Sequence, residues 1–183
     1  MSIDAALTAG EGDKFGQMQA NQAPAKAAEG AGKSVEFISF AIGDDQYGVD
    51  IMAVREIKGW TAITHLPKQP DYVRGVLNLR GVIVPIVDLR CRFGQGLTEA
   101  TPLHIVIIVQ IGARQVGLLA DRVLDIVSQD VAQIQPVPKI AQASRAEFLS
   151  GLVTVDDAMI ALIDLPDLLN SRPEGRQDAE LAN

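Results

Sequence analysis

The chain has few of the residues from which metal sites and covalent cross-links are built. Its 183 residues include one cysteine, Cys91, and two histidines, His65 and His104. A single cysteine cannot form an internal disulfide, and with so few histidines it does not complete a cysteine-based zinc site. The two histidines lie 39 residues apart and lack the spacing of metal ligands. We therefore expect no metal and no other cofactor.

Positive charge, aromatic residues and long apolar runs are also scarce. The formal net charge is −7, which leaves no basic surface for nucleic acid or for an anionic membrane. Aromatic residues make up 4% of the chain, which disfavours a shaped pocket for a small ligand. No run of about 18 apolar residues would cross a membrane, and the start lacks the basic residues of a signal peptide. We expect a soluble cytoplasmic protein with no nucleic-acid partner and no direct membrane insertion.

The chain does contain an internal repeat. Residues 75–90 return in degenerate form from Gly151, at an offset of 76 residues. An upstream segment, residues 37–57, matches residues 106–126 at an offset of 69, with seven identities in 21 positions. The difference between the two offsets places an insertion between about residues 127 and 150. Two similar half-units therefore follow one another along the chain.

The apolar pattern is mostly that of strands. Val- and Ile-rich segments predict strands over residues 35–40, 82–87, 104–111, 115–120 and 159–163. Short helices are expected over residues 71–74, 88–93, 144–149 and 164–169. Each half then holds about five short strands, which can curl into a small barrel without exposed edges. The predicted fold is mainly β, with two pseudo-symmetric five-stranded small barrels packed side by side and a few short helices.

The two ends of the chain differ in composition from its centre. Residues 1–34 are rich in Ala, Gly and Gln and have almost no branched apolar side chains. Such a segment buries too little surface to offset the entropy lost on ordering. We expect a disordered tail there, a domain of two barrel subdomains over residues 35–170, and a flexible tail over residues 171–183.

Several short motifs resemble the CheW family of bacterial chemotaxis coupling proteins. These motifs are Tyr47–Ile51, Val54–Ile57, Leu66–Gly75, Asn78–Gly81 and Ile83–Arg90, within a match from about Val35 to Leu169. The resemblance implies two pseudo-symmetric five-stranded barrels and a non-enzymatic scaffold that couples chemoreceptors to the histidine kinase CheA. Its implied partners are the CheA regulatory domain and the cytoplasmic tips of chemoreceptors, in arrays on the cytoplasmic side.

One predicted turn differs in charge between the repeats. Arg80–Gly81 stands opposite Asp156–Asp157, so the first half alone has a guanidinium at this turn. A guanidinium can make paired hydrogen bonds to a carboxylate, which suits recognition of an acidic or amide-bearing helix tip. The alternative is a solvated turn arginine. The resemblance implies that Arg80, Gly81 and Glu56 bind the receptor, although the counterpart of Glu56 is Asp125, so a structural role at the barrel rim stays open.

The resemblance also implies a receptor-binding groove between the two barrels. Around this groove lie four apolar residues, Val54, Ile105, Val123 and Ile126. An exposed apolar patch of this kind would admit the hairpin tip of a receptor. The repeats share Val54 with Val123 and Ile57 with Ile126, so core packing is the alternative explanation.

The kinase contact is less well defined by the sequence. The family uses the end of its first barrel against the related barrel of the kinase, a head-to-tail contact that can propagate into rings. Residues 134–140 resemble the region that makes the other contact of such a ring, so Gln135 and Ile140 are candidate kinase-binding residues. Gln135 stands where relatives carry a basic residue, which weakens the case for ring closure by this protein.

An enzyme is the rival class. Cys91 lies beside Arg90 and Arg92, which can lower its pKa, but no histidine is near it in sequence, which favours a structural thiol. Asp121 and Asp125 could share one face of a helix, but in the repeat they fall where Met52 and Glu56 do, which favours surface charge over an acid–base pair. We therefore assign no catalytic residue.

Overall fold

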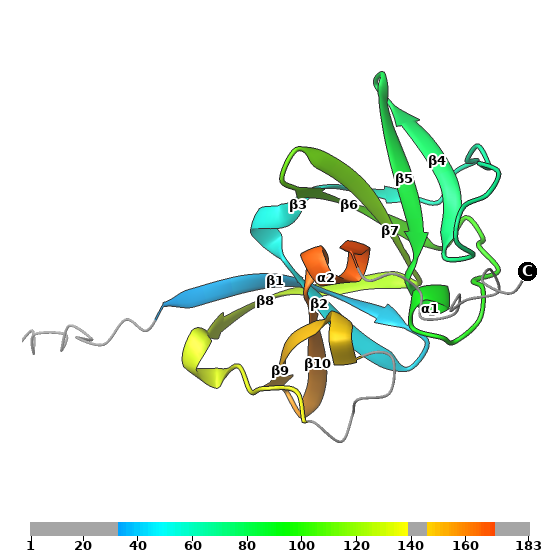
Figure 1. The fold of residues 1–183 in the computed structure, drawn as a ribbon. Coiled ribbons are helices and arrows are strands. Elements are labelled where there is room, and N and C mark those ends of the chain that lie inside the picture. Colours follow the sequence, from blue (N-terminus) through cyan, green and yellow to red (C-terminus); the bar gives the residue numbers. More distant parts are fainter. Residues whose placement is uncertain (1–32, 139–145, 171–183) are drawn as a thin grey trace, which may run out of the picture. The chain divides into compact units, whose positions relative to one another are not determined.

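The computed structural model describes residues 33–138 and 146–170, which form two five-stranded sheets linked by short helices (Figure 1). Sheet A has the strand order β8 (Arg122–Asp130), β1 (Ser34–Ile42), β2 (Asp45–Asp50), β10 (Ala158–Ile163), β9 (Leu149–Val155). Sheet B has the order β3 (Val54–Gly59), β6 (Ile105–Ile111), β7 (Arg114–Ala120), β5 (Val82–Asp88), β4 (Val73–Leu79). The helices include α1 (Leu89–Arg92), α2 (Leu165–Asn170) and the 3₁₀ segments η1 (Ile51–Ala53), η2 (Val131–Gln133) and η4 (Ala146–Phe148). The predicted mainly β fold with two five-stranded units is confirmed.

Each sheet is assembled from both repeats. Strands β1 and β2 of the first repeat lie beside β8, β9 and β10 of the second, while β6 and β7 of the second lie beside β3, β4 and β5 of the first. The expectation that each half of the sequence closes its own barrel is therefore wrong, because the halves exchange strands. The exchange creates two parallel pairs, β2 with β10 and β5 with β7, each joining strands of different repeats.

The pairing registers follow the sequence repeat. In sheet A Phe40 pairs with Val123, and in sheet B their counterparts Val109 and Val54 pair with each other. In the same way Gly48 pairs with Leu162 in sheet A, and their counterparts Gly117 and Ile86 pair in sheet B. Each member of a pair maps onto its counterpart by the offset of 69 or 76 that the sequence shows. The seven-residue difference lies in the longer connection between β8 and β9, which leaves the two sheets with matching registers.

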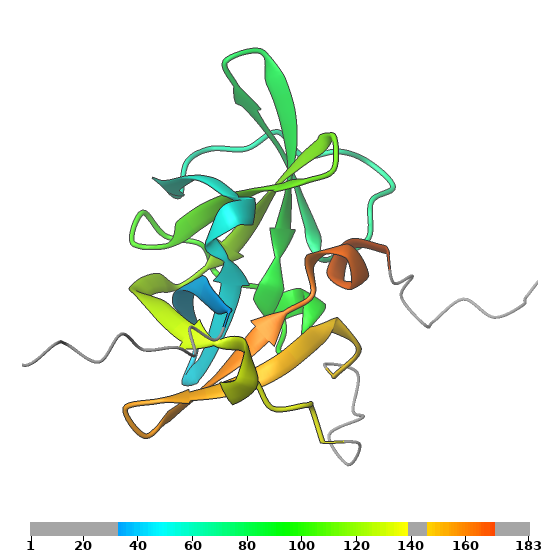
Figure 2. The same cartoon turned by 90° about the vertical axis from the view of Figure 1, so that its left-hand side faces the viewer.

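Two hairpins, β4–β5 and β9–β10, lie on opposite sides of the described region in both views (Figure 1 and Figure 2). The chain that precedes each hairpin pairs with its first strand through an isolated bridge, Thr64 with Val76 and Gln135 with Leu152. These bridges link the segments that follow the edge strands β3 and β8 to the opposite edges, β4 and β9. Each sheet therefore curls toward a small barrel.

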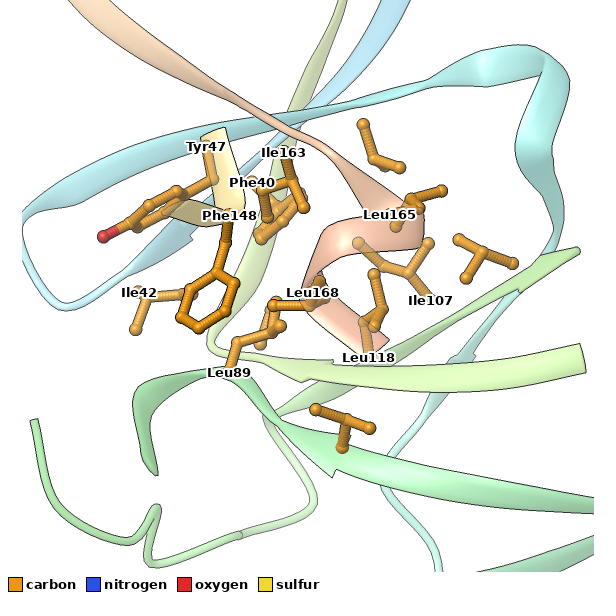
Figure 3. Close-up of a cluster of buried hydrophobic side chains, with 14 of the residues drawn as sticks. Phe40, Ile42, Tyr47, Leu89, Ile107, Leu118, Phe148, Ile163, Leu165 and Leu168 are labelled. Atoms are coloured by element: carbon orange, nitrogen blue, oxygen red, sulfur yellow. The ribbon is translucent and has the colours of Figure 1, made fainter. Parts of the chain in front are cut away.

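The largest core cluster takes side chains from both sheets and from α2 (Figure 3). Its fully or almost fully buried members include Phe40, Ile42, Leu89, Ile107, Leu118, Phe148 and Leu168. Two smaller clusters fill the individual sheets: Leu79, Val84, Ile86, Val106, Ile108 and Leu119 in sheet B, and Phe37, Val153, Ile160 and Leu162 in sheet A. The shared cluster makes the burial of each sheet depend on the other.

The aspartate that both repeats share caps a helix in each. Asp88 Oδ1 accepts the N–H of Cys91 at 3.2 Å at the start of α1, and Asp164 Oδ1 accepts the N–H of Asp167 at 3.0 Å at the start of α2. Capping carboxylates satisfy amide donors that have no partner in the first helical turn. The repeat therefore preserves the strand-to-helix junction as well as the strands.

The expected helix over residues 71–74 is wrong. The N–H of Val73 donates to the carbonyl of Pro70 at 2.8 Å in a single turn, and β4 then begins with the pairing of Val73 to Val87. The expected helix over residues 144–149 is η4 where the chain is described, and α1 and α2 confirm the other two.

One smaller expectation also needs correction. Asp121 and Asp125 do not share a helix, because Asp121 lies in a bend and Asp125 in β8.

A proline within a strand is typical of an edge or a bulge, and Pro85 lies in the internal strand β5. However, the pairing of β5 with β7 begins only at Ile86, so on that side Pro85 lies outside the ladder, where a missing N–H is tolerated.

The described chain starts just before β1. The carbonyl of Lys33 accepts a hydrogen bond from the N–H of Val131 at 3.0 Å, and the strand begins at Ser34. The rest of the expected amino-terminal tail, the expected carboxy-terminal tail and Ile140 lie outside the described residues. In the described part of the chain no helix is long and apolar enough to cross a membrane.

Candidate functional site

The turn between β4 and β5 contains two consecutive residues with left-handed backbone. Arg80 has a φ of 51° and Gly81 a φ of 90°, and the Leu79–Val82 pair closes a two-residue hairpin turn around them. The side-chain oxygen of Asn78 accepts the N–H of Gly81 at 2.8 Å. Glycine adopts this backbone freely, whereas a non-glycine residue held there costs on the order of 1 kcal/mol. The counterpart turn between β9 and β10 has the same backbone, with a φ of 46° at Asp156 and 66° at Asp157, so the conformation of Arg80 follows from the two-residue turn.

Arg80 lies next to Glu56, so the structure brings these two candidate residues together. Arg80 Nη2 is 3.5 Å from Glu56 Oε2, and the side chains are 88% and 30% exposed, respectively. A pair this exposed contributes about 0–1 kcal/mol to stability. Both groups therefore stay available to a partner at little cost to the fold.

A depression of about 240 Å³ opens beside this ion pair. Its lining comes from all five strands of sheet B and the β4–β5 turn: Arg55, Glu56, Leu79, Arg80, Val82, Ile108 and Gln115. Leu79 and Ile108 also belong to the inner cluster of sheet B, so the depression lies above that cluster. We call it the sheet B mouth.

The four apolar candidates divide by exposure. Val54 and Ile105 from sheet B and Val123 from sheet A are half-buried and pack against the core cluster that the two sheets share. Ile126 lies farther along β8 and is 57% exposed. Core packing therefore accounts for part of the burial of the first three residues, whereas the exposure of Ile126 leaves it accessible to a partner.

Asp121 joins four segments of the chain. Its Oδ2 accepts hydrogen bonds from the Gly43 N–H and from Arg90 Nη2, both at 2.7 Å, and its Oδ1 lies 3.6 Å from His104 Nε2. Burial raises the pKa of Asp121, but the hydrogen bonds and the positive charges of Arg90 and His104 outweigh burial, so the pKa is lowered overall. The expected surface charge is thus a structural anchor for α1, the β1–β2 turn and the start of β6.

Asp88 forms a second anchor, and it is fully buried. Besides its helix cap, it accepts the Thr98 N–H at 2.8 Å, the Thr98 hydroxyl at 2.7 Å and Arg74 Nη1 at 3.2 Å. Arg74 Nη1 also donates to the Thr98 carbonyl at 2.8 Å. The loop after α1 is therefore fixed to β4 and β5.

The environment of Cys91 argues against a nucleophile. Burial raises the pKa of its thiol, the charges of Asp88 and Asp71 raise it further, and Arg74 lowers it less. The suggestion that neighbouring arginines lower this pKa is therefore wrong. A thiol with a raised pKa is mostly protonated at neutral pH, as expected for a structural cysteine.

The kinase-side candidate Gln135 is exposed, and its backbone is fixed. Its N–H and carbonyl exchange hydrogen bonds with Leu152 of β9, both at 2.8 Å. At Gly151 an added Cβ would lie 3.1 Å from the Gln135 carbonyl, so the segment packs closely on the hairpin. The structure therefore places Gln135 beside sheet A, whereas the Arg80 turn belongs to sheet B and lies far from Gln135 in the sequence.

Sequence reasoning did not single out Arg55 or Gln115 in the sheet B mouth. Arg55 sits at a register shift of β3, and Gln115 lines the same depression from β7. The sequence signal was available in part, since Arg55 is flanked by the motif residues Val54 and Glu56.

The fold and site define a β-sheet recognition module. Its candidate residues are an exposed charged turn and four apolar side chains, three of them half-buried and one exposed. Within the described residues no group of His, Cys, Asp or Glu could hold a metal ion. The chain belongs to the CheW-like domain family, whose model matches residues 36–172.

Relatives and a solved structure agree with this membership. The chain is 44% identical to the chemotaxis protein CheW of Rhizobium meliloti, over 74% of this chain and 88% of the relative. It is 41% identical to the CheW of Klebsiella aerogenes, over 77% of this chain and 86% of the relative. The scaffolding protein TtCheW of Thermoanaerobacter tengcongensis has a similar structure, with a TM-score of 0.69, 32% identity, and coverage of 76% of this chain and 90% of that one.

Proposed function

We propose that this protein is a non-enzymatic adaptor that couples chemoreceptors to the histidine kinase CheA in bacterial chemotaxis arrays. Its relatives named as chemotaxis proteins and its structural neighbour named as a scaffolding protein support this role. The observation in the structure that carries it is Arg80, an 88% exposed arginine on the β4–β5 turn beside Glu56. Such a group suits recognition better than stabilisation of its own fold.

The receptor side combines the charged turn and the four apolar candidates. Arg80, Gly81 and Glu56 provide the polar contacts, and the apolar contacts come from Val54, Ile105, Val123 and Ile126. Three of these apolar side chains are half-buried against the shared core and are therefore held in place before binding. A preformed surface loses less conformational entropy when a helical tip binds.

The kinase side uses the regulatory domain of CheA as its partner. On the second-repeat side, Gln135 and Ile140 contribute to this contact, which is supported by the exposed side chain and fixed backbone of Gln135. The protein acts in the cytoplasm, at the receptor array. It contacts neither nucleic acid nor the membrane interior.

The mechanism is scaffolding. A receptor tip and the kinase are held in fixed geometry, so a conformational bias at the receptor alters the kinase through differential contact energy. An array is multivalent, so each contact can be weak. A dissociation constant near micromolar, about −8 kcal/mol, is sufficient for each.

Calorimetric titration tests both contacts. The full chain is titrated with the CheA regulatory domain and, separately, with a receptor cytoplasmic-tip fragment, using wild type, Arg80→Glu and the control Arg114→Glu. Arg114 is an exposed arginine at the start of β7 outside the sheet B mouth. We expect Arg80→Glu to weaken receptor binding by about tenfold or more, since reversal of a contact charge costs at least about 1.4 kcal/mol.

Kinase binding by Arg80→Glu and both affinities of Arg114→Glu should stay within about twofold of wild type. If the folded wild type bound neither partner, the adaptor role would be rejected. A fall in the thermal stability of Arg80→Glu that matches its loss of affinity would reject the assignment of Arg80 to the contact.

A further inference from the structure

We propose that the sheet B mouth accepts one carboxylate side chain from the receptor tip, held between the guanidinium groups of Arg55 and Arg80. This inference rests on the proposed function, and it adds a recognition residue, Arg55, and the chemical class of the group that the mouth binds.

A β-bulge directs Arg55 into the mouth. Along β3, Val54 pairs with Val109 and Glu56 with Ile108, so Arg55 is the extra residue of a shifted register. In a regular strand, neighbours point to opposite faces, and Arg55 and Glu56 would not line one depression. A bulge re-aims a side chain, and both residues here line the sheet B mouth.

The charges of the mouth leave room for one more anion. Two guanidinium groups, Arg55 and Arg80, face a single carboxylate, Glu56, which pairs with Arg80. For Arg55 the structure records no ion pair with any described residue, although it lies beside this pair. An incoming carboxylate would neutralise the remaining positive charge and can accept paired hydrogen bonds from a guanidinium.

The second repeat provides an internal comparison. The same bulge recurs in β8, where the shift between Ser39 and Phe40 makes Leu124 the extra residue. The counterparts of Arg55, Glu56 and Arg80 are Leu124, Asp125 and Asp156. The same backbone geometry thus carries two carboxylates and no cation in sheet A. The basic mouth of sheet B is therefore a property of its side chains and not a consequence of the fold.

The lining explains why the anion belongs to a protein side chain. Leu79, Val82 and Ile108 give the lining apolar surface, and Gln115 adds an amide. An acidic side chain can lay its methylene carbons on this apolar surface while its carboxylate reaches the arginines. Val54 directly precedes Arg55 in β3, so the helix that supplies the carboxylate can also contact this apolar candidate.

A double-mutant cycle tests the pairing. The full chain is titrated calorimetrically with a receptor cytoplasmic-tip fragment, and Arg55→Gln is compared with wild type and with the control Arg114→Gln. Arg114→Gln removes the same charge from the same sheet outside the mouth, so it reports any long-range electrostatic effect. Each Glu→Gln and Asp→Asn variant of the fragment is then titrated against both forms of Arg55.

We expect Arg55→Gln to weaken binding about fivefold to tenfold and Arg114→Gln to change it less than twofold. One carboxylate of the fragment should contribute less to binding when Arg55 is already changed, and Arg80 should account for the part that remains. If the wild type binds the fragment but Arg55→Gln binds it equally well, or if no carboxylate of the fragment is coupled to Arg55, the inference is overturned and the adaptor role stands. Failure of the wild type to bind the fragment would overturn both. Self-association that depends on Arg55 and Asp156 would instead assign the mouth to a second copy of this chain.

Discussion

Replacement of Gly75 by alanine should destabilise the protein far more than replacement of other strand glycines. Gly75 lies at the bulge of β4 with a φ of 144°, and an added Cβ would overlap the carbonyl oxygen of Thr64 and lie 2.9 Å from its carbonyl carbon. The clash is with backbone, so no side-chain rotation relieves it. The chain must move Thr64 away from β4.

The cost can be worked out from the structure. A non-glycine residue at this φ costs about 1–2 kcal/mol. Moving Thr64 also breaks the bridge to Val76, with hydrogen bonds of 2.9 and 2.8 Å, each contributing about 0.5–1.5 kcal/mol. The free energy of unfolding should therefore fall by about 2–5 kcal/mol, which lowers Tm by roughly 5–15 °C for a domain of this size.

Two matched glycines make the assay specific. At Gly59 an added Cβ meets no atom within 4 Å, so Gly59→Ala should change stability by less than about 0.5 kcal/mol. Gly151 is the repeat counterpart of Gly75, but its Cβ would press on a side-chain atom, Ile134 Cγ2, at 2.5 Å, so Gly151→Ala should cost an intermediate amount, about 1–2 kcal/mol. Urea titration and thermal melts measure all three. Equal stability of Gly75→Ala and Gly59→Ala would refute the reasoning.

The two buried or half-buried aspartates give further tests. Asp88 accepts hydrogen bonds only from donors, so in Asp88→Asn the new side-chain NH2 group must face a donor, and we expect the free energy of unfolding to fall by about 2–4 kcal/mol in urea titration. Asp164 accepts one hydrogen bond as a helix cap, so Asp164→Asn should cost about 1 kcal/mol or less. Equal losses in the two variants would contradict this. Folding lowers the pKa of Asp121, so its carboxylate stabilises the fold above about pH 4 and this contribution is lost as the pH falls through the lowered pKa. Asp121→Asn should therefore cost about 1–3 kcal/mol at pH 7 and less once the pH falls through the lowered pKa, whereas a cost independent of pH would contradict the role of the charge.

The equivalence of the two sheets was predictable from the repeat, but the exchange of strands was not. The offset of 69 relates Phe40–Val123 to Val109–Val54 in the structure, and the offset of 76 relates Leu162 to Ile86 in the parallel pairs. An alignment of two repeats is the same whether each closes on itself or exchanges strands, because it records equivalence and not partnership. The choice depends on three-dimensional packing around the shared core, which sequence periodicity does not encode.

The site was predictable in its residue types and less so in its geometry. Arg80 and Glu56 were candidates from sequence, and the structure places them 3.5 Å apart. The bulge at Arg55 gives no sequence signal, since β3 contains neither glycine nor proline before its last residue, Gly59. The Asp88 anchor was likewise hidden, because its partner Thr98 comes from a loop whose path depends on the folded strands.

Strand exchange bears directly on how an adaptor can serve two partners. Each sheet contains strands of both repeats and shares one core with the other sheet, so neither half can change its backbone alone. Within the paired strands and their hairpin turns, the repeats then differ mainly in side chains at equivalent positions, such as Arg55 against Leu124 and Arg80 against Asp156. Two ends with the same backbone geometry and different charge can select different partners, while the shared core keeps those partners at a fixed separation.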